Sequence, residues 1–123
     1  MQANHSIDVD VENGFVRYTL SGFFDEVSLA SLRAERAAKL PRLKTQPNQH
    51  ITLCDVSQCT IQSQESLAAL RVMLAHPTWQ ARRLAFVVGG GLARMQVRRV
   101  VSDLPNVQWF ADTTSAEAWL LAD

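Results

Sequence analysis

The chain has 123 residues, of which 47% are hydrophobic and 20% charged, and its formal net charge is +0 at pH 7. These values predict one globular domain over residues 1–123, long enough to bury a core without a disulfide or a metal. The neutral balance gives no support for nucleic-acid binding, and no apolar segment approaches the ~20 residues of a membrane span. Because the first ten residues lack the basic start and apolar run of a signal peptide, we expect a cytoplasmic protein.

Two strands joined in a hairpin are predicted at the start. Residues 7–11 alternate between apolar and acidic side chains, which is the period of a strand with one buried face. Asn13 and Gly14 then favour a short turn, because both residues tolerate a positive φ. Residues 15–21 alternate between apolar and polar side chains and form the returning strand. Arg17 of this strand is expected to share an exposed face with the acidic side chains of the first strand.

A helix and a buried strand are predicted next. Residues 27–40 are rich in Ala, Leu, Arg and Glu, which favour a helix, and Asp25 places a negative charge before its N-terminus. Residues 51–54 form a continuous apolar run, which predicts a strand buried on both faces between parallel neighbours. This strand is expected to stop at Asp55, where a polar loop begins and leads into a second main helix at Ser63.

The second half of the chain alternates between strands and helices. Residues 84–88 give the strongest strand signal and are expected near the centre of the sheet. Residues 92–104 carry apolar side chains at the i, i+3, i+4, i+7 spacing of an amphipathic helix. Residues 107–110 predict a short last strand. Thr114, with Glu117 three residues later, has the pattern of a capping box at the start of a final helix.

The resulting order, β-β-α-β-α-β-α-β-α, predicts an α/β fold. Alternation after the opening hairpin implies right-handed crossovers and a five-stranded, mostly parallel mixed sheet with helices packed on it. Cys54 lies in the buried strand and Cys59 five residues later, so both are expected to be structural thiols rather than a disulfide or a metal pair. The three histidines are scattered, and neither a metal site nor a cofactor is predicted.

The element order, with the strand that leads into Asp55-Val56-Ser57 and the helix that begins at Ser63, resembles the SpoIIAA-like, or STAS, domain of anti-sigma-factor antagonists. The resemblance covers nearly the whole chain. It is closest to small bacterial stand-alone proteins described as STAS/SEC14-like. Their opening hairpin ends in Gly-Phe-Phe, as at residues 22–24, and their last helix ends in an Ala-x-x-Trp-Leu type of sequence. The resemblance implies a SpoIIAA-like fold.

In the antagonists, an Asp-Ser-Ser-Gly turn starts the helix after this strand, and the partner kinase phosphorylates its second serine. The corresponding turn here is Ser63-Gln64-Glu65-Ser66, so Glu65 replaces the phosphorylated serine and Ser66 replaces the glycine. The resemblance therefore implies a surface for a protein partner, but the substitution puts a phosphoswitch in doubt. Glu65 can act as a permanent negative charge, and Ser63 or Ser66 can serve as an alternative phosphate acceptor.

The first candidate surface comprises five residues after the third strand: Asp55, Ser57, Ser63, Glu65 and Ser66. A charged residue directly after a buried strand lies at the carboxyl end of the sheet, where open α/β sheets bind ligands and partners. Structural roles are the alternative. Asp55 can accept hydrogen bonds from nearby backbone amides, Ser63 can cap the helix, and Glu65 can compensate the helix dipole.

The second candidate site is a glycine loop with the arginines that follow it: Gly89, Gly90, Gly91, Arg94 and Arg98. Backbone N–H groups between a strand and a helix can bind an anion, and arginines one turn apart can add charge-assisted hydrogen bonds. Residues 67–101 contain six arginines and no Asp or Glu, which favours recognition of a carboxylate or phosphate. The alternatives are a tight strand-to-helix turn and a solvated basic surface.

These patterns favour a non-enzymatic regulatory or protein-interaction module, which docks an unidentified protein partner through the first surface. The alternative is a carrier of a small anionic compound or acidic lipid, of Sec14-like type, that uses residues 89–94. An enzyme is the least supported class, because no nucleophile–base pair, metal cluster or paired carboxylates emerge. The opening hairpin or a helix face can also supply the interface of a homodimer.

Overall fold

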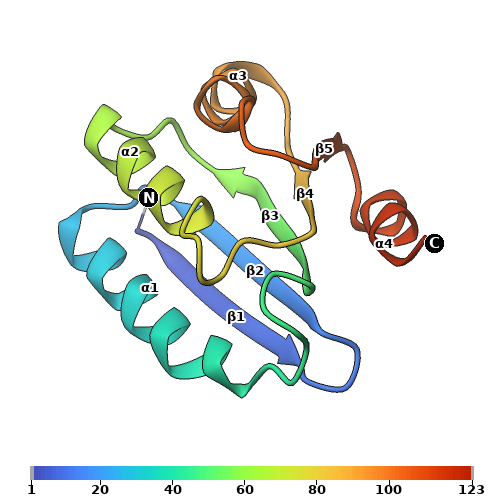
Figure 1. Ribbon diagram of the computed structural model, residues 1–123. Helices are drawn as coiled ribbons and strands as arrows, with labels where there is room; N and C mark the ends of the chain where they lie inside the picture. Colours follow the sequence, from blue (N-terminus) through green and yellow to red (C-terminus); the bar gives the residue numbers. More distant parts are fainter. Residues whose placement is uncertain (1, 123) are drawn as a thin grey trace.

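The computed structural model describes residues 2–122 and has the predicted order of strands and helices (Figure 1). The elements are β1 (Asn4–Asp10), β2 (Phe15–Gly22), α1 (Glu26–Lys39), the 3₁₀ helix η1 (Leu40–Arg42), β3 (Ile51–Cys59), α2 (Gln64–Leu74), β4 (Arg83–Val87), α3 (Gly91–Val101), β5 (Val107–Phe110) and α4 (Thr113–Leu121). The predicted α/β class is therefore confirmed.

Within residues 2–122, the strands form one five-stranded sheet whose spatial order equals the chain order, β1-β2-β3-β4-β5. β1 and β2 are antiparallel, and the other pairs are parallel, as the mostly parallel mixed sheet requires. β3 is the central strand, and its first five residues pair with β2 on one side and β4 on the other. This position explains its continuous apolar run. β4, which was expected near the centre, lies one strand from the edge.

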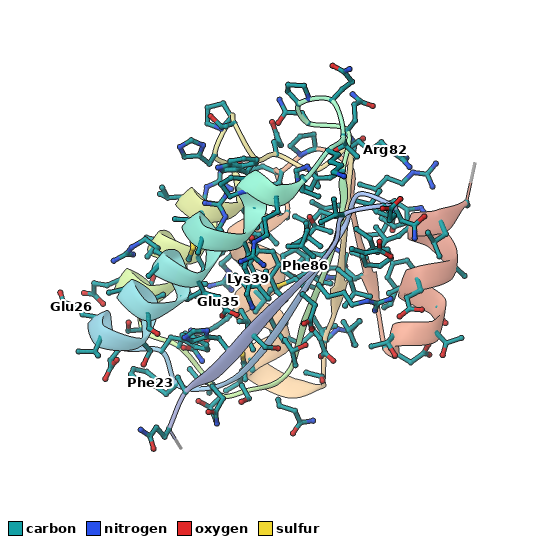
Figure 2. The ribbon with its side chains drawn as sticks, turned by 90° about the horizontal axis from the view of Figure 1, so that it is seen from below. Phe23, Glu26, Glu35, Lys39, Arg82 and Phe86 are labelled. Atoms are coloured by element: carbon teal, nitrogen blue, oxygen red, sulfur yellow. The ribbon has the colours of Figure 1, made fainter. Side chains whose placement is uncertain are left out.

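Three helices, α1, α2 and α3, cover one face of the sheet, and α4 covers the other (Figure 1; Figure 2). The steps from β2 to β3, to β4 and to β5 all move one strand in the same direction. Right-handed crossovers that step in one direction place their helices on the same face. The opposite face of β3 and β4 would therefore be bare if α4 did not turn back across it.

Two apolar cores result from this layering. Phe24, Phe86 and Leu32 are almost fully buried in the core beneath α1, α2 and α3. The smaller core beneath α4 contains Phe15, Ile51, Leu53, Ala85, Val87, Ala116 and Leu120. Neighbouring residues of β3 and β4 contribute to opposite cores, as the period of a strand dictates.

β3 is longer than predicted, because it continues through Asp55 to Cys59. Pairing with β4 ends at Asp55, and the remaining residues pair only with β2. A register shift between Thr19 and Ser21 brings Gly22 opposite Cys59. Asp55 therefore lies inside the strand rather than at its end. Backbone pairing with β2 extends the strand, and of residues 55–59 only Val56 is buried in the core, which is too little to give an apolar pattern in the sequence.

Two predicted local motifs differ in detail. The hairpin turn has four residues, 11–14, of which Gly14 has a positive φ of 61° while Asn13 does not. At the start of α4, the N-cap is Asp112 instead of Thr114, and its side chain accepts a hydrogen bond from Ser115 N at 2.7 Å. The capping-box prediction is therefore wrong, and Glu117 pairs with Arg17 of β2 instead.

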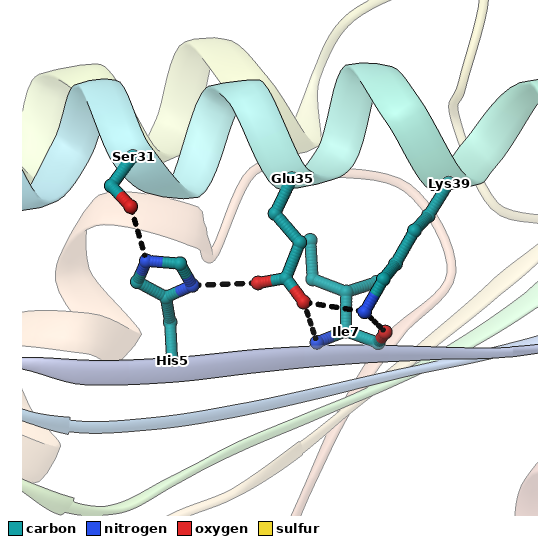
Figure 3. A network of polar contacts seen from close by, with 5 residues as sticks. All are labelled: His5, Ile7, Ser31, Glu35 and Lys39. Atoms are coloured by element: carbon teal, nitrogen blue, oxygen red, sulfur yellow. Dashed lines mark hydrogen bonds and ion pairs between the residues drawn. The ribbon is translucent and has the colours of Figure 1, made fainter.

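Side chains of α1 cover the outer edge of β1 (Figure 3). Glu35 Oε2 accepts a hydrogen bond from Ile7 N at 3.0 Å, and Lys39 Nζ donates to Ile7 O at 2.6 Å. Lys39 also pairs with Glu35, and His5 Nδ1 lies 2.6 Å from Glu35 Oε1. The outward backbone groups of Ile7 are thus satisfied, which blunts a sheet edge that would otherwise be free to pair with another strand.

Candidate functional site

Gln62, in the loop between β3 and α2, joins three segments at the carboxyl end of the sheet. Its side chain is buried, with 6% exposure. Oε1 accepts from Phe24 N at 2.8 Å, and Nε2 donates to Gly22 O at 2.8 Å and Thr60 O at 2.6 Å. Its backbone N–H and C=O pair with the side-chain amide of Gln96, both at 2.8 Å. The β2–α1 loop, the β3–α2 loop and α3 are therefore fixed to one another.

The polar residues predicted for partner binding are largely engaged in internal hydrogen bonds. Asp55 Oδ1 accepts from Ser57 N at 3.0 Å and from Ser57 Oγ at 2.6 Å. Ser63 caps α2 by accepting from Ser66 N at 3.1 Å. Ser66 is buried, and its Oγ donates to Phe24 O. The anchoring role of Asp55 and the capping role of Ser63 are thus present in the structure.

Glu65 is exposed in the first turn of α2, and exposed apolar side chains occupy the neighbouring segments. Phe23 is 40% exposed and Ile61 is 51% exposed. They lie on the two loops that Gln62 joins, and Figure 2 places Phe23 at one end of the molecule with Glu26. We call Phe23, Val27, Ile61 and Glu65 the loop surface. Neither residues 22–32 nor residues 51–70 contain Lys or Arg, so its charge is acidic.

The glycine loop opens onto a cleft of about 400 Å³ at the carboxyl ends of β4 and β5. Two of its lining residues are joined by a backbone hydrogen bond, which Val88 N donates to Phe110 O at 3.0 Å. We call it the β4–β5 cleft. Its lining residues are Val88, Gly89, Gly90, Arg94, Trp109, Phe110 and Ala111.

The three glycines have different structural roles at this cleft. Gly90 is the N-cap of α3 and offers no side chain to the N–H groups of the first turn. A β-carbon added at Gly90 would meet nothing within 4 Å, so the backbone is open there. Gly91 has a φ of +77°, which favours glycine. Gly89 is packed instead, because a β-carbon there would come within 3.1 Å of Ser57 O.

The structure brings the two predicted sites into contact. A smaller hollow of about 60 Å³ has Ser57 on one side, from the first set, and Gly89 and Arg94 on the other. The close approach of Gly89 to Ser57 O joins the same two segments. Neighbouring parallel strands end at the same edge of the sheet, which accounts for this meeting.

Arg94 and Arg98 do not act together at the cleft. Arg94 lines it and makes no side-chain hydrogen bond or ion pair within residues 2–122. The Arg98 guanidinium lies over the Trp109 ring, 5.6 Å from its centroid. Phe86 also stacks on Trp109, with 4.9 Å between the ring centroids. Arg98 is therefore not a lining residue, contrary to its predicted place beside Arg94. It packs on Trp109 instead.

Several residues of both sites are absent from the sequence-based prediction. Gln62 and Gln96 resemble ordinary polar residues of a loop and a helix, and only tertiary contacts reveal their roles. Trp109 and Phe110 follow the alternation of a buried strand, yet both line the cleft. The order of the elements could have indicated Trp109 and Phe110, because the end of the last strand must lie beside the glycine loop in a parallel sheet.

The cysteines are poor candidates for chemistry at neutral pH. Burial raises the pKa of the Cys54 thiol strongly, and the neighbouring Cys59 and Asp55 raise it further. Burial, followed by the charge of Asp55, raises the pKa of Cys59 to about 11. Since the thiolate is the nucleophile and metal ligand, both residues are held in the unreactive form. Within the described chain, no group of three His, Cys, Asp or Glu side chains is placed to hold a metal.

Comparisons with known proteins bear on the fold. No family model matches the sequence, and no curated protein matches it. The structure is similar to that of an uncharacterised protein of the DUF3478 family, described as having a SpoIIAA-like fold, from Shewanella loihica PV-4. The two are 17% identical, with a TM-score of 0.70 over 96% of this chain and 93% of the other. This chain has a SpoIIAA-like fold.

The SpoIIAA-like fold confirms the architecture that the resemblance implied. It does not by itself assign an activity, because one fold supports many functions. On this fold the helix start after β3 carries an exposed carboxylate, Glu65, next to a buried hydroxyl, Ser66. No helix within residues 2–122 has the length and apolar character that crossing a bilayer requires.

Proposed function

We propose that this SpoIIAA-like protein is a non-enzymatic interaction module that docks a protein partner through the loop surface of Phe23, Val27, Ile61 and Glu65. The observation that carries the proposal is the buried Gln62, which fixes both loops while their apolar side chains project into solvent. A rigid backbone lowers the entropic cost of binding, because the loops need not be ordered on contact.

The composition of the loop surface indicates the chemistry of its partner. Fully burying a large apolar side chain contributes about 1.5–3 kcal/mol, so Phe23 and Ile61 are suitable anchors. Glu65 and the nearby Asp25 and Glu26 are exposed and acidic, and no basic residue lies in either loop. The surface therefore fits a protein segment that presents apolar side chains flanked by Lys or Arg.

The hydrogen bonds of the serines favour a surface that binds without phosphorylation. The Ser66 hydroxyl is buried against Phe24 O, and Ser63 is needed as the cap of α2. Glu65 already supplies a negative charge at the helix start, where the positive end of the helix dipole stabilises it. We therefore expect the partner to bind the unmodified protein.

Capture from the native host and a matched set of variants test the proposal. The recovered partner is purified, and its affinity is measured by titration calorimetry. Ile61→Glu should weaken binding at least tenfold, because it places a charge in the apolar contact. Leu121→Glu is the control, since Leu121 is 60% exposed on α4 across the sheet and should bind as the wild type does.

A charge reversal tests the acidic part of the surface. Glu65→Lys should slow association and reduce its dependence on salt, because it removes attraction to a basic partner. Glu12→Lys is the control, since Glu12 is equally a surface residue but lies in the hairpin turn at the other end of the strands. The site assignment is wrong if Ile61→Glu and Glu65→Lys both bind every recovered partner with unchanged affinity. Native mass spectrometry of the complex gives its stoichiometry.

A further inference from the structure

We propose that the β4–β5 cleft, distinct from the loop surface, binds a small phosphate compound that carries a planar ring. Four observations carry this inference.

The first is size. Small-molecule sites usually occupy about 300–1,000 Å³, and the cleft measures about 400 Å³. This volume suits a compound of one ring and one phosphate. Four other hollows within residues 2–122 are smaller, at about 160 Å³ or less.

The second is an uncommitted charge. Arg36, Arg71 and Arg83 donate to the backbone oxygens of Met73, of Val100, and of Trp119 and Ala122, and Arg17 pairs with Glu117. Arg94 has no such internal partner in the described chain, and unlike the exposed Arg82 and Arg99, which also have none, it lines the cleft. A guanidinium binds phosphate through two parallel hydrogen bonds, so Arg94 is suited to this group.

No acidic side chain opposes the guanidinium within the lining. Asp112 follows the lining residue Ala111, but its carboxylate accepts from Ser115 N and caps α4. The open backbone at Gly90 adds N–H groups of the first turn of α3 on the same side as Arg94.

The third is the aromatic wall. Trp109 lines the cleft and is held between Arg98 and the stacked ring of Phe86. Phe110 also lines the cleft, from the opposite face of the sheet, where its ring packs on Trp119 with 5.9 Å between the centroids. Because these neighbours occupy the ring faces, the rings meet the cleft at their edges, and a planar ring can pack against such edges in the edge-to-face geometry that aromatic pairs favour.

The fourth observation excludes a long acyl chain as the apolar part of the ligand. The apolar cavity between the sheet and helices α2 and α3 measures only about 40 Å³ and is lined by side chains such as Leu67, Leu70 and Val97. That space accommodates only a few atoms. The cleft itself is walled by rings and backbone, so it favours a ring over a lipid tail.

Titration with phenyl phosphate, followed by ¹H–¹⁵N NMR, tests the inference. We expect shifts at the backbone amides of Gly89, Gly90 and Gly91 and at the indole N–H of Trp109. Phenol lacks the phosphate and inorganic phosphate lacks the ring, so each should bind at least tenfold more weakly. Vesicles of phosphatidylglycerol distinguish a lipid headgroup from a soluble phosphate, and they should leave these signals unchanged.

Two variants separate binding from folding. Arg94→Gln should weaken binding about tenfold, since it removes a charge-assisted bond, whereas Arg82→Gln at the other end of β4 should not. Gly90→Asp places a carboxylate at the cleft in a residue whose extended conformation already suits an N-cap. We expect it to keep or raise the thermal midpoint of unfolding and to abolish binding.

The inference is overturned if phenyl phosphate shifts no signal in the cleft at millimolar concentration, or if phenol binds equally well. It is also overturned if Gly90→Asp folds and binds unchanged, or if the vesicles shift the cleft signals and phenyl phosphate does not. None of these outcomes depends on the loop surface, so failure here leaves the protein-docking proposal standing.

Discussion

At the scale of single residues, Gln62 joins the loops at this end of the sheet through its side-chain amide. Its side chain bonds to Phe24 N and Gly22 O, so truncation leaves Phe24 N without a partner and Gly22 O with only its hydrogen bond from Thr60 N. Unsatisfied buried groups cost about 1–3 kcal/mol each. We expect Gln62→Ala to lower the free energy of unfolding by about 2–4 kcal/mol, measured by urea denaturation.

Gln58→Ala is the matched control for Gln62→Ala, because Gln58 is an exposed glutamine of β3. Its effect should stay within about 0.5 kcal/mol, as for most surface substitutions. Equal losses in the two variants would contradict the structural role assigned to Gln62.

Residue roles that depend on short-range contacts were predictable, and those that depend on distant contacts were not. Asp55 bonds to Ser57 two residues away, and Ser63 bonds to Ser66 three residues away, so their types and spacing indicate their roles. Gln62 reaches Phe24 across 38 positions. Nothing local distinguishes such a glutamine from a solvated one.

At the scale of elements, α1 is held on β1 by Glu35. Partial burial raises the pKa of this carboxyl, but hydrogen bonds from Lys39, His5 and Ile7 N lower it more, so the net shift is below the ordinary value of 4.5. Because the folded pKa is lowered, the unfolded chain takes up this proton at a higher pH than the folded chain does as the pH falls. The stabilisation is therefore present above the unfolded pKa and is lost as the pH falls through the folded pKa.

We expect Glu35→Gln to lower the free energy of unfolding by about 1–2 kcal/mol near neutral pH, because it weakens bonds to Lys39 and Ile7. The difference from the wild type should narrow as the pH falls below 4.5, where the wild type also loses its carboxylate. Denaturation at a series of pH values measures this, with Glu12→Gln in the hairpin turn as control. A difference that stays constant down to acid pH would show that the charge of Glu35 is irrelevant.

Element boundaries were predictable where side-chain burial sets them. β5 has the predicted bounds, 107–110, and β4 differs from its predicted range by one residue. The extension of β3 to Cys59 was not predictable, because it depends on backbone pairing with β2 and on a single buried apolar residue, Val56. The start of α4 was misassigned because Asp112 and Thr114 are both residue types that cap helices. Asp112, which is nearer β5, is the cap in the structure.

At the scale of the whole molecule, three buried acidic groups make the stability of the fold depend on alkaline pH. Burial raises the pKa of Tyr18 to about 12, although Arg36 lowers it, and burial also raises the pKa of Cys54 and Cys59. Above the ordinary values of 9.0 for Cys and 10.0 for Tyr, the unfolded chain releases protons that the folded chain keeps. The stabilising contribution of these groups is therefore complete below their ordinary pKa values, and it is lost as the pH rises.

We expect the free energy of unfolding, measured in reductant, to decrease above about pH 9 in the wild type. A Cys54→Ala, Cys59→Ala double variant should start from a lower value but decline only from about pH 10, where Tyr18 begins to contribute. Parallel decline of the two proteins from the same pH would assign the loss to other groups.

The chain order of the sheet also has a consequence for synthesis. Since every strand pairs only with its immediate predecessor and successor, a growing polypeptide can add each new strand to one that has already emerged from the ribosome. The face beneath α4 stays uncovered until the final segment arrives. Until α4 is made, this exposed apolar face of the sheet is where we expect a chaperone to bind during translation.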